Sequence, residues 1–389
     1  MAKRIIALAI SFILLTAGAF AAEVQADAEN AGAGEEEAVT LELNAKSVLL
    51  MEAQTGRVLY EQNPHERLAP ASVTKVMTLL LAMEALDEGR IKLTDEATCS
   101  EHAASLGGSQ IYLEPGEVMT VVDLLKAIAV ASANDASVML AEHIAGSEEG
   151  FVEMMNARAK KLGMKNTTFV NSYGLEDPDH RTTAYDVALM SRELLKHEKV
   201  FDYTKIWMDT LRDGKFGLAN TNKLVRFYNG CTGLKTGSTG AALYCISATA
   251  LRDNMHLIAV VMGSPTSAER FSAATKLLDY GFANYAMAHP KLPELPKIKV
   301  LKGIADSVSL KAEGDGAVLL EKSKARDIEA RLSLPESLQA PVEKGQKVGA
   351  VIFEVDGEQV ASLTLRAAES VRRAGFFDML RRLLRRLLI

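Results

Sequence analysis

The chain has 389 residues, a formal net charge of -6 at pH 7, 48% hydrophobic residues and 24% charged residues. This length and composition predict a sizeable core and more than one domain, so they exclude disorder as the general state of the chain. The acidic balance excludes a general nucleic-acid binder, which needs a basic surface to neutralise phosphates.

The N-terminus predicts export. Lys3 and Arg4 precede an apolar run that ends in small residues, which is the layout of a secretory signal peptide, and we expect it to cover residues 1–21. An uncleaved membrane anchor is the alternative, because the apolar run nearly reaches spanning length. Residues 22–40 are rich in Ala, Glu and Gly without an apolar period, which predicts a flexible acidic spacer.

The elements that follow predict an α+β domain over residues 41–290. The stretch KSVLLMEAQTGRVLYEQN contains two apolar runs around Gly56, which is typical of a β-hairpin. From Ser72 to about Glu88 a predicted helix is apolar nearly all round, as expected in the core of a large domain. Two further helical patterns are TVVDLLKAIAVASANDASVMLAEHI, from about Thr120, and EGFVEMMNARAKKLG.

Later in this domain three strand-like runs follow one another closely. They are TGLKTGST, ALYCISATAL and MHLIAVVMG, and the turns between them are short enough for an antiparallel meander. An N-terminal hairpin and a late meander that bracket several helices predict an antiparallel sheet with helices packed on it.

The proline-bearing stretch AHPKLPELPK marks a domain boundary. Short apolar runs with Gly-containing turns follow it and predict a small all-β domain over residues 291–366. Residues 367–389 end in FFDMLRRLLRRLLI, where Phe and Leu share one helical face and four arginines occupy the other. Such a helix is too short to span and is expected to lie on an anionic membrane surface.

Ser72 and Lys75, in the stretch PASVTKVMT, are the first candidate catalytic residues. A serine and a lysine three residues apart lie on one face of a helix. A serine hydroxyl is a weak nucleophile until a base removes its proton, and a lysine can be that base if burial and neighbouring positive charge lower its pKa. In the first helical turn, unpaired backbone N–H groups can also meet developing negative charge.

Two further motifs follow in order. The stretch VASANDAS contains Ser132 and Asn134, and the predicted strand TGLKTGST contains Lys235, Thr236 and Gly237. Ser-x-x-Lys, Ser-x-Asn and Lys-Thr-Gly in this order form the signature of penicillin-binding proteins and related β-lactamases. The seven histidines show no zinc-ligand spacing, so a zinc carboxypeptidase is not expected.

The chain resembles the low-molecular-mass penicillin-binding proteins that are serine-type D-alanyl-D-alanine carboxypeptidases. GGSQIYLEPGE, NSYGLEDPDHRTTAYD and SAERFSAATKLLDYGF carry the resemblance beside the three motifs, over about residues 41–366. It implies a β-lactamase/transpeptidase-like catalytic domain, with a five-stranded antiparallel sheet flanked by helices. Ala133 departs from the glycine expected at the centre of Ser-x-Asn.

The resemblance implies a role for each candidate residue. Ser72 would attack the carbonyl between the terminal D-alanines of a peptidoglycan stem peptide, with Lys75 as base. Ser132 would relay a proton to the leaving D-alanine, and Asn134 would hold the substrate amide and orient Lys75. The substrate-binding set, which would hold the terminal carboxylate and the oxyanion, is Lys235, Thr236, Gly237, Ser238 and Arg270.

The expected partners are peptidoglycan stem peptides, β-lactams as inhibitors, and an anionic membrane surface at the outer face of the bacterial cytoplasmic membrane; no cofactor is implied. A serine β-lactamase is a rival, but no Glu-x-x-Leu-Asn motif lies between Asn134 and Lys235. A penicillin-sensing or peptidoglycan-binding module without turnover is the other alternative. His180 is expected to order its loop rather than to act in catalysis.

Overall fold

The computed structural model describes residues 41–314, 316–324 and 328–380. The predicted signal peptide, the spacer and the arginine-rich end of the C-terminal helix lie outside these residues. Among the helices within the described ranges, none has the length and apolar character needed to cross a membrane.

A five-stranded sheet forms the centre of the first part of the chain, as predicted. In spatial order its strands are β2 (Val58–Gln62), β1 (Ser47–Glu52), β9 (Met255–Ser264), β8 (Leu243–Arg252) and β7 (Cys231–Thr239). All neighbouring pairs are antiparallel. The predicted hairpin and meander therefore join in one sheet, and β7, which carries the Lys-Thr-Gly motif, is an edge strand.

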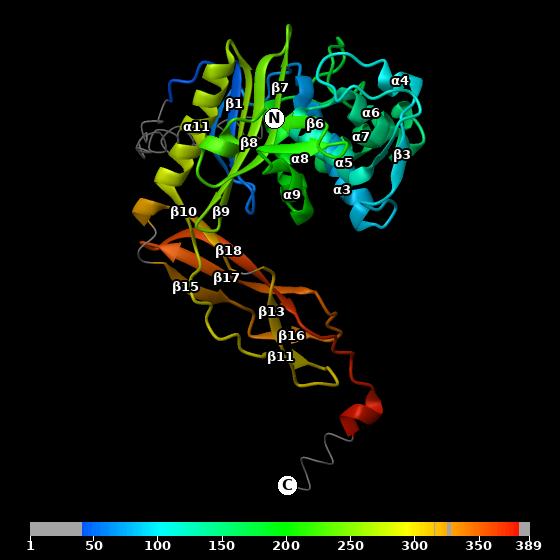
Figure 1. Ribbon diagram of the computed structural model, residues 1–389. Coiled ribbons are helices and arrows are strands. Elements are labelled where there is room, and N and C mark those ends of the chain that lie inside the picture. Colours follow the sequence, from blue (N-terminus) through cyan, green and yellow to red (C-terminus); the bar gives the residue numbers. More distant parts are fainter. Residues whose placement is uncertain (1–40, 315, 325–327, 381–389) are drawn as a thin grey trace, which may run out of the picture. The chain divides into compact units, whose positions relative to one another are not determined.

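Helices cover both faces of this sheet (Figure 1). On one face, a Cβ added to Gly281 of α11 (Ser267–Asn284) would touch Leu50 and Leu257, so this helix packs closely on β1 and β9. On the other face, Ser191 of α8 (Ala184–Leu194) bonds to Ser247 of β8. The helix α3 (Lys75–Asp87) packs beside α8 and is buried on nearly every side, as its apolar sequence predicts.

The remaining helices and two short hairpins complete this part of the chain. The helices are η1 (Ala71–Thr74), α4 (Glu101–Ala104), α5 (Val121–Lys126), η2 (Ala127–Ala131), α6 (Asn134–Ala145), α7 (Glu148–Leu162), η3 (Glu198–Val200), α9 (Phe201–Thr204) and α10 (Leu224–Phe227). β3 (Glu96–Thr98) pairs with β4 (Val118–Thr120), and β5 (Met208–Leu211) pairs with β6 (Phe216–Ala219). These hairpins were not predicted, because strands of three or four residues carry too little periodicity.

The helical pattern predicted from about Thr120 is not one helix. α5 gives way to the π-helical turn η2, Ser132 adopts a left-handed conformation with φ of 65°, and α6 begins at Asn134. The apolar pattern continues across the break because both sides pack into the same core, with Ile128 and Val138 fully buried. The apolar periodicity of the sequence therefore gives no sign of the break between η2 and α6.

The second part of the chain is all-β, as predicted. Its strands are β11 (Ile298–Leu301), β12 (Ser307–Val308), β13 (Leu310–Ala312), β14 (Val318–Glu321), β15 (Glu329–Ser333), β16 (Ser337–Gln339), β17 (Lys347–Val355) and β18 (Glu358–Ala367), with the short turn η4 (Lys322–Lys324). They form sheets of order β13-β18-β17-β15 and β12-β11-β16, and β14 pairs with β10 (Tyr285–Ala288). Val351, Phe353 and Leu365 lie in one of two small cores.

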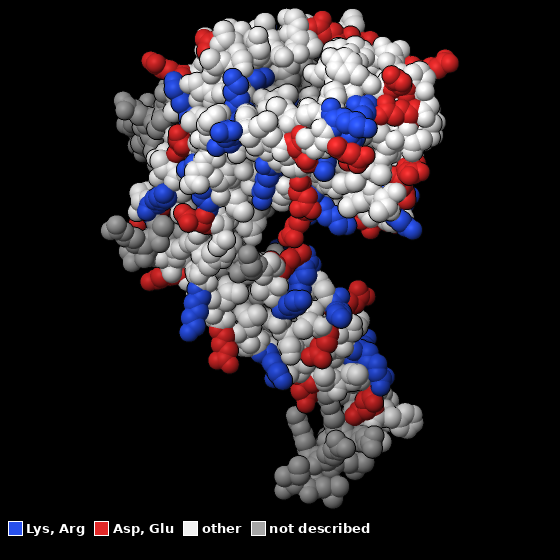
Figure 2. Space-filling model, viewed as in Figure 1, with Lys and Arg blue, Asp and Glu red and all other residues white. Residues whose placement is uncertain are grey.

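Charges of both signs are interspersed on the face shown in Figure 2. In the all-β part, Arg331 pairs with Glu354 at 2.7 Å and Arg366 with Glu313 at 2.9 Å. Solvent-exposed pairs of this kind contribute at most about 1 kcal/mol each. The stability of this part therefore depends mainly on its apolar cores.

Candidate active site

Ser72 and Lys75 lie together where the sheet meets the helices. Ser72 is half-buried in η1, and Lys75 is the first residue of α3 and has no exposed surface. Lys75 Nζ donates to Ser72 Oγ at 3.0 Å, to Asn134 Oδ1 at 2.7 Å and to the carbonyl of Tyr173 at 2.7 Å. The lysine of the Ser-x-x-Lys motif is therefore held against the serine by two further acceptors.

The pKa of Lys75 is well below its ordinary value. Burial is the main cause, because it penalises the charged ammonium, and the nearby charge of Lys235 lowers the pKa further. Asp135 acts in the opposite direction. A lowered pKa increases the fraction of neutral amine, which is the form that can accept the Ser72 proton.

The break between η2 and α6 brings the Ser-x-Asn motif to this lysine. Asn134 Nδ2 donates to the carbonyl of Gly107 at 2.7 Å, which leaves Oδ1 for Lys75. Ser132 is 4% exposed and lies at the left-handed break. Within the described part of the chain, its hydroxyl makes no hydrogen bond, so it is free to turn toward a substrate.

The Lys-Thr-Gly motif lines the edge strand β7. Lys235 is 1% exposed, and its Nζ donates to the carbonyl of Thr236 at 2.9 Å. Burial first, and the charge of Arg270 second, lower the pKa of Lys235 to about 7. The Thr236 hydroxyl donates to Thr221 Oγ1 at 2.7 Å, a partner that the sequence did not indicate.

Gly237 is where β7 comes closest to Ser72. A Cβ at this position would lie 2.8 Å from the backbone nitrogen of Ser72 and 2.8 Å from the carbonyl oxygen of Pro70. Only glycine fits without moving the strand away from η1. Ser238 is the next residue of β7 and is exposed.

Arg270 reaches the inner side of β7 from α11. Its Nη1 donates to the carbonyls of Gly237 and Cys245, both at 3.3 Å, and its guanidinium carbon lies 4.4 Å from the ring centroid of Phe271. Burial lowers the pKa of Arg270 to about 10. Together with Lys235 it places two basic groups under β7 with no carboxylate bonded to either within the described residues, which favours an anionic ligand.

The loop that contains Tyr173 and His180 closes the site from the other side. A Cβ on Gly174 would lie 1.9 Å from the carbonyl oxygen of Ala71, so this loop packs tightly against η1. His180 Nδ1 accepts from the N–H of Val170, and its Nε2 lies 2.8 Å from Thr74 Oγ1. Burial lowers the pKa of His180 to about 4, so the ring is neutral and ties the loop to η1.

Tyr173 was missed by the sequence reasoning because it acts through its carbonyl, which every residue possesses. Its only signal was position, since it lies in NSYGLEDPDHRTTAYD, one of the stretches that carry the family resemblance. The contacts and charges above link Ser72, Lys75, Asn134, Lys235, Gly237 and Arg270. Ser132, Thr236 and Ser238 lie next to these residues in the chain, and Ser132 and Ser238 make no side-chain hydrogen bond within the described residues.

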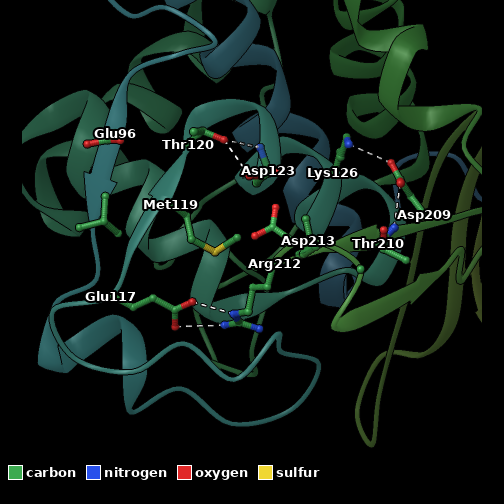
Figure 3. A pocket seen from close by; sticks show the side chains of 13 residues that line it. Glu96, Glu117, Met119, Thr120, Asp123, Lys126, Asp209, Thr210, Arg212 and Asp213 are labelled. Atoms are coloured by element: carbon green, nitrogen blue, oxygen red, sulfur yellow. Dashed lines mark hydrogen bonds and ion pairs between the residues drawn. The ribbon is translucent and has the colours of Figure 1, made fainter.

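A separate hollow of about 450 Å³ lies beside the β5–β6 hairpin and contains none of the predicted site residues (Figure 3). Two ion pairs cross it: Arg212 with Glu117 at 2.7 Å, and Lys126 with Asp209 at 3.0 Å. Both pairs tie this hairpin to neighbouring elements.

Comparison with known proteins agrees with this geometry. Residues 33–266 match the family described as D-alanyl-D-alanine carboxypeptidase, and residues 293–373 match the one described as penicillin-binding protein 5, C-terminal domain. The D-alanyl-D-alanine carboxypeptidase DacF of Bacillus subtilis is 48% identical over 87% of this chain and 88% of that protein.

Two solved structures are similar to this chain. Penicillin-binding protein 5 of Haemophilus influenzae is 34% identical, with a TM-score of 0.79 over 86% of this chain and 99% of that one. Penicillin-binding protein D2 of Listeria monocytogenes, in its ampicillin-bound form, is 33% identical, with a TM-score of 0.58 over 63% of this chain and 100% of that one. With a fold, a motif arrangement and a family match that agree, this chain belongs to the D-alanyl-D-alanine carboxypeptidase family of serine peptidases.

Proposed function

We propose that this chain removes the terminal D-alanine from peptidoglycan stem pentapeptides through an acyl-enzyme on Ser72, and that β-lactams acylate the same serine. The observation that carries the proposal is the fully buried Lys75 Nζ, 3.0 Å from Ser72 Oγ. Release of free D-alanine from a peptide ending in D-Ala-D-Ala, by the wild-type chain and not by Ser72→Ala, tests it.

In the proposed acylation, Ser72 Oγ attacks the scissile carbonyl while neutral Lys75 takes the hydroxyl proton. The backbone N–H groups of Ser72 and Ser238 stabilise the oxyanion, an arrangement that the contact of β7 with η1 allows. The proton returns from Lys75 through the Ser132 hydroxyl to the leaving nitrogen, the C–N bond breaks, and D-alanine departs. Water then attacks the ester, which frees Ser72 and the shortened peptide.

The substrate carboxylate is proposed to bind beside Lys235 and Thr236, with Arg270 contributing positive charge. These cations have no carboxylate in hydrogen-bond contact in the described chain, so an incoming carboxylate offsets the cost of their burial. A penicillin presents a carbonyl and a carboxylate of similar spacing, which explains why one site would accept both ligands.

The lowered pKa of Lys235 predicts a loss of acylation activity at high pH. Its pKa is lowered to about 7, so above that pH the free enzyme loses the ammonium that attracts the carboxylate. We expect the second-order rate constant for acylation by benzylpenicillin to fall by about tenfold per pH unit above this value. Because arginine keeps its charge, Lys235→Arg is expected to move this descending limb upward by at least about two pH units. Identical limbs in the two proteins would contradict the assignment.

Export and membrane attachment are also part of the proposal. Residues 376–380 are helical, and Phe376 and Phe377 are 76% and 81% exposed, which fits a face that inserts among acyl chains at the outer face of the cytoplasmic membrane. Deletion of residues 370–389 is expected to move the processed protein from the membrane fraction to the supernatant. If the deleted form still sediments with membranes without detergent, an uncleaved N-terminal anchor is the better explanation.

A further inference from the structure

The segment of residues 107–117 lies directly against Asn134. The carbonyl of Gly107 accepts from Asn134 Nδ2 at 2.7 Å, and the carbonyl of Ser109 accepts from the Asn134 backbone N–H at 2.7 Å. A side-chain amide can be turned by 180° at little cost unless its neighbours distinguish oxygen from nitrogen. The Gly107 carbonyl therefore favours Nδ2 on its own side, which leaves Oδ1 facing Lys75, while the Ser109 carbonyl fixes the backbone of Asn134.

The 107–117 segment is fixed from the inside by Asp135. This carboxylate has no exposed surface and accepts from the N–H of Ile111 at 3.0 Å and of Leu113 at 3.1 Å. Between them, Tyr112 is 67% exposed and has a left-handed φ of 57°, a conformation that costs about 1–2 kcal/mol for a residue with a side chain. A backbone that bends in this way needs contacts that hold it.

Arg212 supplies those contacts from the outside. It stands at the turn between β5 and β6, where its Nη1 donates to the carbonyl of Ile111 at 2.8 Å and its Nη2 to the carbonyl of Tyr112 at 3.4 Å. Nε and Nη2 also bond to the two carboxylate oxygens of Glu117 at 2.7 and 3.0 Å, and Figure 3 shows the two side chains facing each other. The guanidinium of Arg212 therefore forms hydrogen bonds to three residues of the segment.

We propose that Arg212 is a positioning residue: by fixing the 107–117 segment it holds the Asn134 amide with its oxygen toward Lys75. This inference rests on the roles proposed for Lys75 and Asn134. Without Arg212 the segment keeps its bonds to Asp135 but loses its outer contacts, so the carbonyls of Gly107 and Ser109 are held less firmly. The amide of Asn134 can then shift or turn and present Nδ2 to the lysine.

Arg212→Gln in the full-length chain tests the inference, with Lys126→Gln as the matched control. Lys126 is the other cation of the hollow and also pairs with the β5–β6 hairpin, but no hydrogen bond joins it to the 107–117 segment. We expect Arg212→Gln to lower the rate of acylation by benzylpenicillin by about ten- to a hundredfold, since an error of about 1 Å in a catalytic group costs about a hundredfold. Lys126→Gln is expected to keep the wild-type rate.

The pH profile separates positioning from a general loss of stability. The groups that face Lys75 are the Ser72 hydroxyl, the Asn134 amide and the Tyr173 carbonyl, with the charges of Lys235 and Asp135 nearby. Loss of the Asn134 acceptor disfavours the ammonium, so the ascending limb of the acylation profile should move to lower pH. A variant that is only less stable has fewer active molecules, but the ascending limb of its acylation profile stays at the same pH as in the wild type.

The inference requires that Arg212→Gln shows both a lower acylation rate and a shifted ascending limb, and that Lys126→Gln shows neither. A wild-type rate, a loss shared by Lys126→Gln or an unmoved limb overturns the inference. If Arg212→Gln does not fold, Arg212→Lys decides by the same criteria, because lysine keeps the charge but its three N–H donors cannot bond to both carbonyls and both carboxylate oxygens of Glu117 at once. A wild-type chain that forms no Ser72 adduct overturns the proposed function itself, and this inference with it.

Discussion

Lys75→Met is expected to lower the rate of acylation by benzylpenicillin by about 10²- to 10⁴-fold, the usual contribution of a general base. Methionine has a similar length and an apolar end, so it fits the fully buried position that Lys75 occupies. The loss should therefore appear in the chemistry and not in the amount of folded protein.

The control for this variant is Lys160→Met. Lys160 lies in the last turn of α7 and is exposed, so its replacement is expected to leave acylation unchanged. Stopped-flow or gel-based measurement of the penicilloyl adduct gives the rate, and thermal unfolding reports the fold. Acylation of Lys75→Met within tenfold of the wild-type rate would assign the base to another group.

Gly237→Ala is the second large effect that we expect. The new Cβ would lie 2.8 Å from the Ser72 nitrogen and 2.9 Å from the Val73 nitrogen, closer than side-chain carbons approach such atoms. β7 must then move away from η1, which separates the backbone N–H of Ser238 from that of Ser72. Loss of one oxyanion donor costs about 10²- to 10³-fold in rate.

Gly217→Ala in β6 is the matched control for the added methyl group. A Cβ at Gly217 meets nothing within 4 Å, and its backbone is not left-handed. We expect this variant to acylate at the wild-type rate, measured in the same assay. If Gly237→Ala also acylates within about tenfold of wild type, the oxyanion site is not built from these two N–H groups.

Much of the fold could be predicted because long apolar runs dominate it. The meander β7–β8–β9 has strands of nine or ten residues separated by short turns, and its limits in the structure differ little from the predicted ones. The all-round apolar character of α3 correctly indicated a buried helix. Ser72 and Lys75 could be paired from their spacing together with the Ser-x-Asn and Lys-Thr-Gly motifs that follow in order.

The motifs and the family resemblance indicated the other site residues as well, but not the contacts that hold them, since these depend on backbone groups and on distant segments. The Tyr173 carbonyl that Lys75 uses lies 98 residues away and carries no signature of its residue type. Ser132 occupies a left-handed break that the uninterrupted apolar pattern concealed. Arg212 belongs to none of the sequence motifs, and its contacts are with carbonyls about 100 residues away in the 107–117 segment.

The most direct test of the account is D-alanine release from a peptide ending in D-Ala-D-Ala, measured for the wild-type chain and for Ser72→Ala, each also treated with benzylpenicillin. The account predicts release and a penicilloyl adduct in the wild type, and neither in the variant. A folded wild-type chain that forms the adduct but releases no D-alanine would contradict the carboxypeptidase assignment and favour a penicillin-binding module without turnover. Release that continues in Ser72→Ala would contradict the nucleophile.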